Sequence, residues 1–120
     1  MRILVADDER VLANTVATAL RAAFDAEVDV AFDGITAQHL ARKHQYSLAL
    51  IDFSLPPPTG LELLASWQDE GLTHPVLMMS GGHAASRRTD ALAAGATGYL
   101  EKPFPLAELI DEVRSSLGTP

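Results

Sequence analysis

The chain has 120 residues, no cysteine and a net charge of −7, with sixteen acidic residues against nine Lys and Arg. That length suits a single domain, the acidic charge argues against direct binding to nucleic acid or anionic lipid, and the lack of cysteine excludes disulfides and thiolate metal sites. No apolar run is long enough to span a membrane and no segment resembles a signal peptide, so a cytoplasmic location is expected.

Short apolar segments of strand length alternate with helical patterns along the chain. The first, third and fourth of these segments are apolar throughout, which is typical of parallel strands that are covered on both faces. The expected strands are Ile3–Ala6, Val28–Phe32, Leu48–Ile51, Val76–Met79 and Thr97–Leu100.

The intervening segments carry helix signals of different strength. The last helix, over 106–117, has a clear i, i+3, i+4, i+7 apolar stripe, and Pro105 suits its first turn. Thr59 and Glu62 predict a capping box at the start of the third helix. The segment 84–94 is helical by composition, but it is rich in alanine and predicts the least firmly anchored helix.

Five strand–helix units predict an α/β fold, namely a doubly wound (βα)5 domain with a five-stranded parallel sheet and helices on both faces, as in flavodoxin-like proteins. The two usual strand orders bring the first strand against the third or the fourth. In the order 2-1-3-4-5, the acidic ends of the first and third strands are neighbours across a crevice. The expected domain covers residues 1–117, and 118–120 form a tail or the start of a linker.

Polar side chains follow four of the predicted strands. Asp7 and Asp8 end the first, Asp52 the third, Ser80 the fourth and Lys102 the fifth. Carboxylates that converge at one sheet edge repel each other, by roughly 4 kcal/mol for two charges at 4 Å and a dielectric near 20, so a cation or a proton must lie among them. Oxygen ligands suit Mg²⁺, and a lysine suits a phosphoryl group. The pattern therefore predicts phosphoryl transfer to Asp52 as the nucleophile.

These motifs, in this order and at this spacing, resemble the receiver domain of two-component response regulators over essentially the whole chain, and the resemblance implies the strand order 2-1-3-4-5. The resemblance implies a signalling module that takes up a phosphoryl group and catalyses its own phosphorylation and dephosphorylation, rather than an enzyme. The motifs that carry it are Asp7-Asp8, Asp52, the turn Pro56–Gly60, Ser80, Gly95-Ala96 and Tyr99–Phe104.

The resemblance also implies a role for each residue of the site. Asp52 would accept a phosphoryl group from a sensor histidine kinase, a phosphotransfer protein or a small donor such as acetyl phosphate. Asp8, Asp52 and the backbone carbonyl of Ser54 would bind Mg²⁺, with Asp7 acting mostly through a metal-bound water. Lys102 would pair with the phosphoryl group.

Two further residues would form the switch in this family. The hydroxyl of Ser80 would move towards the phosphoryl group, and the ring of Tyr99 would turn inward, so that binding of an effector domain or partner changes. The Lys102–Pro103 peptide would be cis. A phosphorylation-dependent homodimer is a further expectation, although Thr97-Gly98 stands where receivers of winged-helix regulators often carry two acids.

The chain departs from the family in the turn after Asp52, where three consecutive prolines, Pro56, Pro57 and Pro58, replace the usual single one. Prolines fix φ and remove donors, so this loop should be stiff. Ser54 and Gly82 are small residues that would flank the path of an attacking water, and they predict an unobstructed site.

Simpler interpretations remain open at this stage. Asp7 and Asp8 could cap the first helix, Ser80 could be an ordinary strand-end hydroxyl, and Tyr99 could be half-buried packing. A flavodoxin-like flavin binder would share the fold, but it needs a phosphate loop without acids. A metal-dependent phosphatase would need a second acid where Ser54 stands. A degenerate receiver, which signals without phosphate, would not need the set of strand-end acids and lysine.

Overall fold

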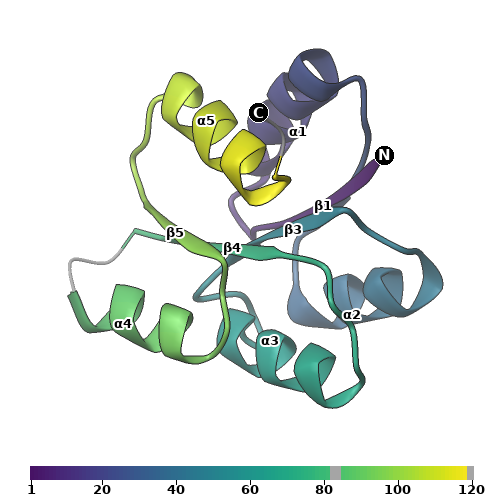
Figure 1. Cartoon of the computed structure of the whole chain (residues 1–120), viewed down its shortest axis with the longest axis vertical. Helices are drawn as coiled ribbons and strands as arrows, with labels where there is room; N and C mark the ends of the chain where they lie inside the picture. Colours follow the sequence, from purple (N-terminus) through teal and green to yellow (C-terminus); the bar gives the residue numbers. More distant parts are fainter. Residues whose placement is uncertain (82–84, 119–120) are drawn as a thin grey trace.

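The computed structural model describes residues 1–81 and 85–118, and it forms one sheet with helices on both faces (Figure 1). All strand pairs are parallel, and their order is β2-β1-β3-β4-β5, which confirms the predicted fold class and strand order. The strands are β1 (Arg2–Ala6), β2 (Glu27–Ala31), β3 (Leu48–Asp52), β4 (Val76–Ser80) and β5 (Gly98–Glu101).

The helices form two layers that enclose two separate parts of the apolar core. Helices α1 and α5 cover one face of the sheet, and α2, α3 and α4 cover the other (Figure 1). Strands β3 and β4 are buried along their whole length, as expected of central strands covered on both sides. The helices are α1 (Arg10–Phe24), α2 (Gly34–Lys43), α3 (Gly60–Asp69), α4 (Ala85–Ala93) and α5 (Leu106–Ser116).

The predicted element boundaries agree with the structure to within one residue for every strand. The one-residue difference matters at the ends of β3 and β4, because Asp52 and Ser80 are the last residues of these strands and do not follow them. The Thr59–Glu62 capping box is confirmed in both directions. Pro105 caps α5 from outside rather than in its first turn, because its backbone is extended while its carbonyl accepts from the N–H of Leu109.

The described residues of helix α4 contribute little large apolar surface to the core. Of the predicted segment 84–94, residue 84 lies outside the described residues. Ala91 is fully buried, whereas Leu92, the large apolar residue of the segment, is 42% exposed. The helix therefore offers no large aliphatic anchor among its described residues, and its arginines make the notable side-chain contacts described below.

The triple-proline loop lies against the start of α2. The backbone N–H of Gly34 donates to the carbonyl of Pro56 at 2.9 Å. A Cβ atom at Gly34 would overlap the carbonyl oxygen of Pro58, so this position accepts only glycine without a shift of the backbone. The loop that follows Asp52 is thus fixed by close backbone contact with a neighbouring helix.

Candidate functional site

Three carboxylates meet at the carboxyl edge of the sheet. Strands β1 and β3 are neighbours in register, with Ala6 opposite Ile51, so the residues that follow them converge. Carboxylate oxygens of Asp7, Asp8 and Asp52 all lie within 4.8 Å of one another. Asp7 is fully buried and Asp52 is 5% exposed, whereas Asp8 faces solvent.

Lys102 joins this cluster from the end of β5. Its backbone N–H donates to the carbonyl of Ser80 at 2.8 Å, which fixes the base of the side chain. Its Nζ lies 2.7 Å from Asp7 Oδ2 and 3.3 Å from Asp52 Oδ1. A third acid, Glu9, places Oε2 at 3.1 Å from the same nitrogen. The peptide bond from Lys102 to Pro103 is cis, the isomer that the family resemblance implies.

The charges of this cluster shift the pKa values of its members. Burial and the Asp7 carboxylate raise the pKa of Asp52 to about 6, although the Lys102 ammonium opposes the shift. Burial disfavours the charged form of Lys102, but its contacts with Asp7, Asp52 and Glu9 outweigh that penalty and raise its pKa. Lys102 is therefore positively charged at neutral pH.

The cluster opens into a crevice of about 370 Å³. With Asp7 beneath it, the described residues of the crevice place four carboxylates against two cationic side chains, which leaves an excess of negative charge. The lining residues are Asp8, Glu9, Asp52, Ser54, Gly81, Arg87 and Lys102.

This donor set fits a magnesium ion. Asp7 Oδ2 is buried, and the Lys102 ammonium lies 2.7 Å from it. Hard carboxylate oxygens at a solvent-facing crevice are the ligands that Mg²⁺ prefers, and the ion would offset the excess negative charge. The side chains that could hold it are those of Asp7, Asp8 and Asp52.

Ser80 and Tyr99 lie behind the crevice on neighbouring strands. Ser80 is fully buried, and its Oγ accepts a hydrogen bond from Arg87 Nη1 at 2.6 Å. The Tyr99 ring is 7% exposed and packs in the core cluster on the α3 and α4 side, with Arg88 Cζ 5.5 Å from the ring centroid. The Tyr99 side chain is thus buried in this structure.

Sequence reasoning missed Glu9 and Arg87. Glu9 follows the acidic pair directly, and its backbone N–H donates to Asp7 Oδ1 at 2.9 Å, so adjacency in sequence was a usable signal. Arg87 comes from a helix rather than a strand end, and the strand-end pattern carries no signal for it. Ser54 is exposed and lines the crevice, whereas Gly82 lies outside the described residues.

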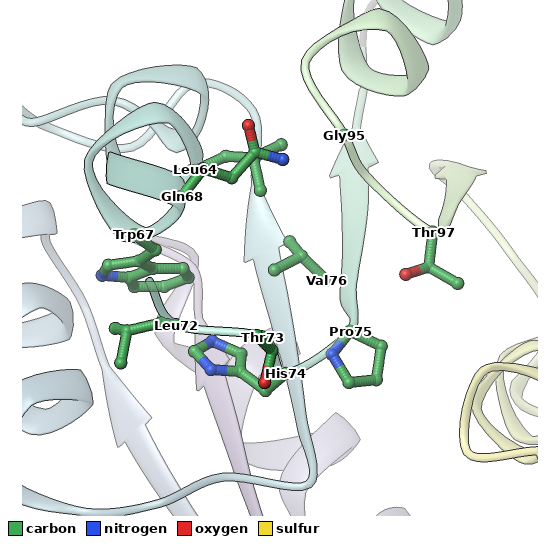
Figure 2. Close-up of a pocket in the computed structure, with 10 residues that line it drawn as sticks. All are labelled: Leu64, Trp67, Gln68, Leu72, Thr73, His74, Pro75, Val76, Gly95 and Thr97. Carbon is green, nitrogen blue, oxygen red and sulfur yellow. The ribbon is translucent and has the colours of Figure 1, made fainter. Parts of the chain in front are cut away.

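A second hollow, of about 240 Å³, lies at the opposite, amino edge of the sheet (Figure 2). The rings of Trp67 and His74 lie side by side there, with centroids 5.1 Å apart. Burial lowers the pKa of His74, so that ring is neutral at pH 7. No acid or permanent cation lines this hollow among the described residues.

Comparisons with known proteins show the family to which this chain belongs. The family model described as "Response regulator receiver domain" matches residues 3–114. The transcriptional regulatory protein TctD of Salmonella typhimurium is 40% identical over 117 residues, and CutR of Streptomyces coelicolor is 38% identical over 115. These matches cover 98% and 96% of this chain, respectively, but each covers 52% of the relative, so the chain spans about half the length of either protein.

Solved structures of receiver domains have the same fold as this chain. The receiver domain of the Francisella response regulator 1452 has a TM-score of 0.90 at 30% identity, over 98% of this chain and 96% of that one. A receiver domain of a sensor histidine kinase from Pseudomonas aeruginosa has a TM-score of 0.86 at 28% identity and covers 98% of each chain; that structure has a magnesium ion in its active site cleft. With its family match, its relatives and its strand-end site, this chain belongs to the response regulator receiver domain family.

Proposed function

We propose that Asp52 is the phosphorylation site of this receiver domain. A carboxylate oxygen of Asp52 attacks the phosphorus of a phosphohistidine on a sensor histidine kinase or a phosphotransfer protein. A phosphorus–oxygen bond forms, the phosphorus–nitrogen bond breaks, and the imidazole leaves with the electron pair. With acetyl phosphate as the donor, the leaving group is acetate.

The observation that carries this proposal is the position of Asp52 between a cluster of acids and one lysine. Its carboxylate shares the crevice with Asp8 and lies 3.3 Å from Lys102 Nζ. Lys102 is charged and held by three acids, so it can pair with the extra negative charge of a phosphoryl group without a change of protonation. Mg²⁺ held by Asp7, Asp8, Asp52 and the Ser54 carbonyl would neutralise charge on the transferring group.

Ser80 and Tyr99 are the proposed switch. Ser80 ends β4 beside Asp52, since β3 and β4 pair with Asp52 opposite Met79. A hydroxyl there can donate to an oxygen of the phosphoryl group. Tyr99 lies on the neighbouring strand β5, and a change in its packing would alter the surface formed by α4 and β5.

The partner would be an effector domain or a separate protein that recognises this altered surface. The relatives TctD and CutR are named as transcriptional regulatory proteins. In a regulator of that kind the receiver would act as the input domain, and a phosphorylation-dependent homodimer would be one way to pass the signal on.

The alternative functions have less support. A flavin phosphate would meet Asp7 and Asp8 after β1 and be repelled by them. A phosphatase that uses a second acid two residues after its nucleophile would find Ser54 there. A receiver that works without phosphate would not need the Lys102 contacts with three carboxylates.

The test is the intact mass of the protein after incubation with acetyl phosphate and Mg²⁺. We expect a gain of one phosphoryl group in the wild type, none after removal of Mg²⁺ with a chelator, and none in Asp52→Asn. Asp69→Asn is the matched control, because this exposed acid at the end of α3 should leave the gain unchanged. An equal gain in Asp52→Asn, or none in the wild type, would contradict the proposal.

A further inference from the structure

Glu9 contacts the same lysine nitrogen as two acids of the candidate site. Its Oε2 accepts a hydrogen bond from Lys102 Nζ at 3.1 Å. Carboxylate oxygens of Asp7 and Asp52 lie 2.7 and 3.3 Å from that nitrogen. An ammonium group has three N–H donors, so three acids at these distances can engage all of them. A phosphoryl group that pairs with Lys102 must therefore share this nitrogen with acids that already surround it.

The three acids differ in how easily they can give up Lys102. Asp7 is fully buried, so loss of the ammonium would leave a buried charge without its nearest cation. Asp52 is the proposed acceptor, and a phosphoryl group bound to it stays beside Lys102. The Glu9 side chain is 61% exposed, so water can solvate its carboxylate when the contact breaks. Glu9 is thus the acid that can leave Lys102 at the lowest cost.

Glu9 also has room to move. It lines the acidic crevice and a neighbouring hollow of about 470 Å³, and both are also lined by Gly81 and Lys102. The backbone N–H of Glu9 donates to Asp7 Oδ1 at 2.9 Å, and this contact does not depend on the side chain. The Glu9 carboxylate can therefore turn away from Lys102 while the main chain beside the acids stays in place.

Charge adds to this competition for Lys102. A phosphoryl group carries about two negative charges, and the described residues of the crevice already include more acids than cations. A carboxylate next to Lys102 repels an approaching anion and offsets part of the positive charge that would attract it. Glu9 should therefore weaken binding of an anion and strengthen binding of a cation such as Mg²⁺.

We propose that Glu9 competes with the phosphoryl group for Lys102 and so lowers the affinity of the site for phosphoryl groups. This inference rests on the proposed function of Asp52. It gives the acid that directly follows Asp7 and Asp8 a role of its own. The acidic pair would hold the metal ion, whereas Glu9 restrains binding of the group that the ion attracts.

The experiment measures the affinity of the protein for beryllofluoride, a phosphoryl mimic, by titration calorimetry at a Mg²⁺ concentration that saturates every variant. Glu9→Gln should bind it about fivefold more tightly than the wild type, because the competing charge of a partly exposed ion pair is removed. Glu9→Asp keeps the charge but is one methylene shorter, which withdraws it from Lys102, and it should gain about threefold. Glu101→Gln is the matched control, because this exposed acid is next to Lys102 in sequence but outside its described ion pairs. Its affinity should stay within about 1.5-fold of the wild type.

The affinity for Mg²⁺ alone separates competition from structural damage. It should fall about twofold in Glu9→Gln, because an acid leaves the crevice, whereas a damaged site would bind both ligands less well. Unchanged or weaker binding of beryllofluoride in Glu9→Gln, wild-type affinity in Glu9→Asp, or an equal gain in Glu101→Gln would overturn the inference and leave the role of Asp52 intact. Failure of the wild type to bind beryllofluoride would overturn both.

Discussion

The two edges of the sheet handle charge in opposite ways. At the amino edge, Arg2 contacts both Asp29 and Glu27 at 2.8 Å, and the Tyr46 hydroxyl donates to Asp29 Oδ2 at 2.7 Å. Opposite charges are matched there, and they contribute to the stability of the fold. At the carboxyl edge, acids outnumber cations around Asp52, so the described residues there carry an excess of negative charge.

At the carboxyl edge, the loop that follows Asp52 is held by close backbone contacts. The loop after Asp52 rests on Gly34, and a Cβ at Gly60 would come within 2.5 Å of the Asp52 carbonyl oxygen. Towards the amino edge, side-chain contacts join neighbouring elements. Trp67 Nε1 of α3 donates to Gln38 Oε1 of α2 at 2.8 Å, and the Trp67 ring lies beside His74 (Figure 2). Sites that bind charged ligands often keep such unbalanced charge at a cost in stability.

The largest expected effect comes from breaking the backbone fit with Gly34→Ala. Because the new Cβ would overlap the carbonyl of Pro58, the start of α2 or the proline loop must move. We expect a loss of about 3 kcal/mol in the free energy of unfolding, measured by urea denaturation. Gly81→Ala is the control, since its Cβ would meet no described residue within 4 Å, and it should cost less than about 1 kcal/mol. Equal losses in the two variants would show that the close approach is unimportant.

A smaller effect, of opposite sign, should follow removal of the charge of Asp52. Burial and Asp7 raise the pKa of Asp52, so the folded state is less stable with this group ionised. In the absence of metal, Asp52→Asn should raise the melting temperature by about 4 °C at pH 7, allowing for water that reaches part of the crevice.

Magnesium should offset this difference in melting temperature between Asp52→Asn and the wild type. Binding of Mg²⁺ to the folded state stabilises the protein by RT ln(1 + [Mg²⁺]/Kd), and the wild type should bind the ion more tightly than Asp52→Asn. The melting temperature of the wild type should therefore rise more with Mg²⁺ than that of the variant. A variant that melts below the wild type without metal would mean that the Asp52–Lys102 contact outweighs the repulsion.

The contrast between the edges also explains what could be predicted from the sequence. Asp7, Asp52 and Lys102 follow apolar strands, and the parallel topology gathers strand ends at one edge, so their meeting follows from local pattern and strand order. Arg87 reaches Ser80 only because α4 packs at a particular angle, and Gly34 meets Pro58 only through a tertiary contact. No pattern within a short segment specifies either approach.

The smallest effect tests the matched charges of the amino edge through pH. Partial burial opposes ionisation of Asp29, but hydrogen bonds from Tyr46 and Arg2 outweigh it and lower its pKa. The contribution of a group with a lowered pKa is complete above its unfolded value of about 3.9, and it is lost as the pH falls through the folded value.

Asp29→Asn should therefore be less stable than the wild type by about 1 kcal/mol at pH 7, as measured by urea denaturation. That difference should shrink when the pH falls below about 4, because the wild-type carboxylate then becomes protonated as well. Asp69→Asn removes an exposed acid at the same edge and should show no such dependence. A difference that stays constant from neutral to acidic pH would mean that Asp29 stabilises the amino edge through its shape and hydrogen bonds, and that its charge contributes nothing.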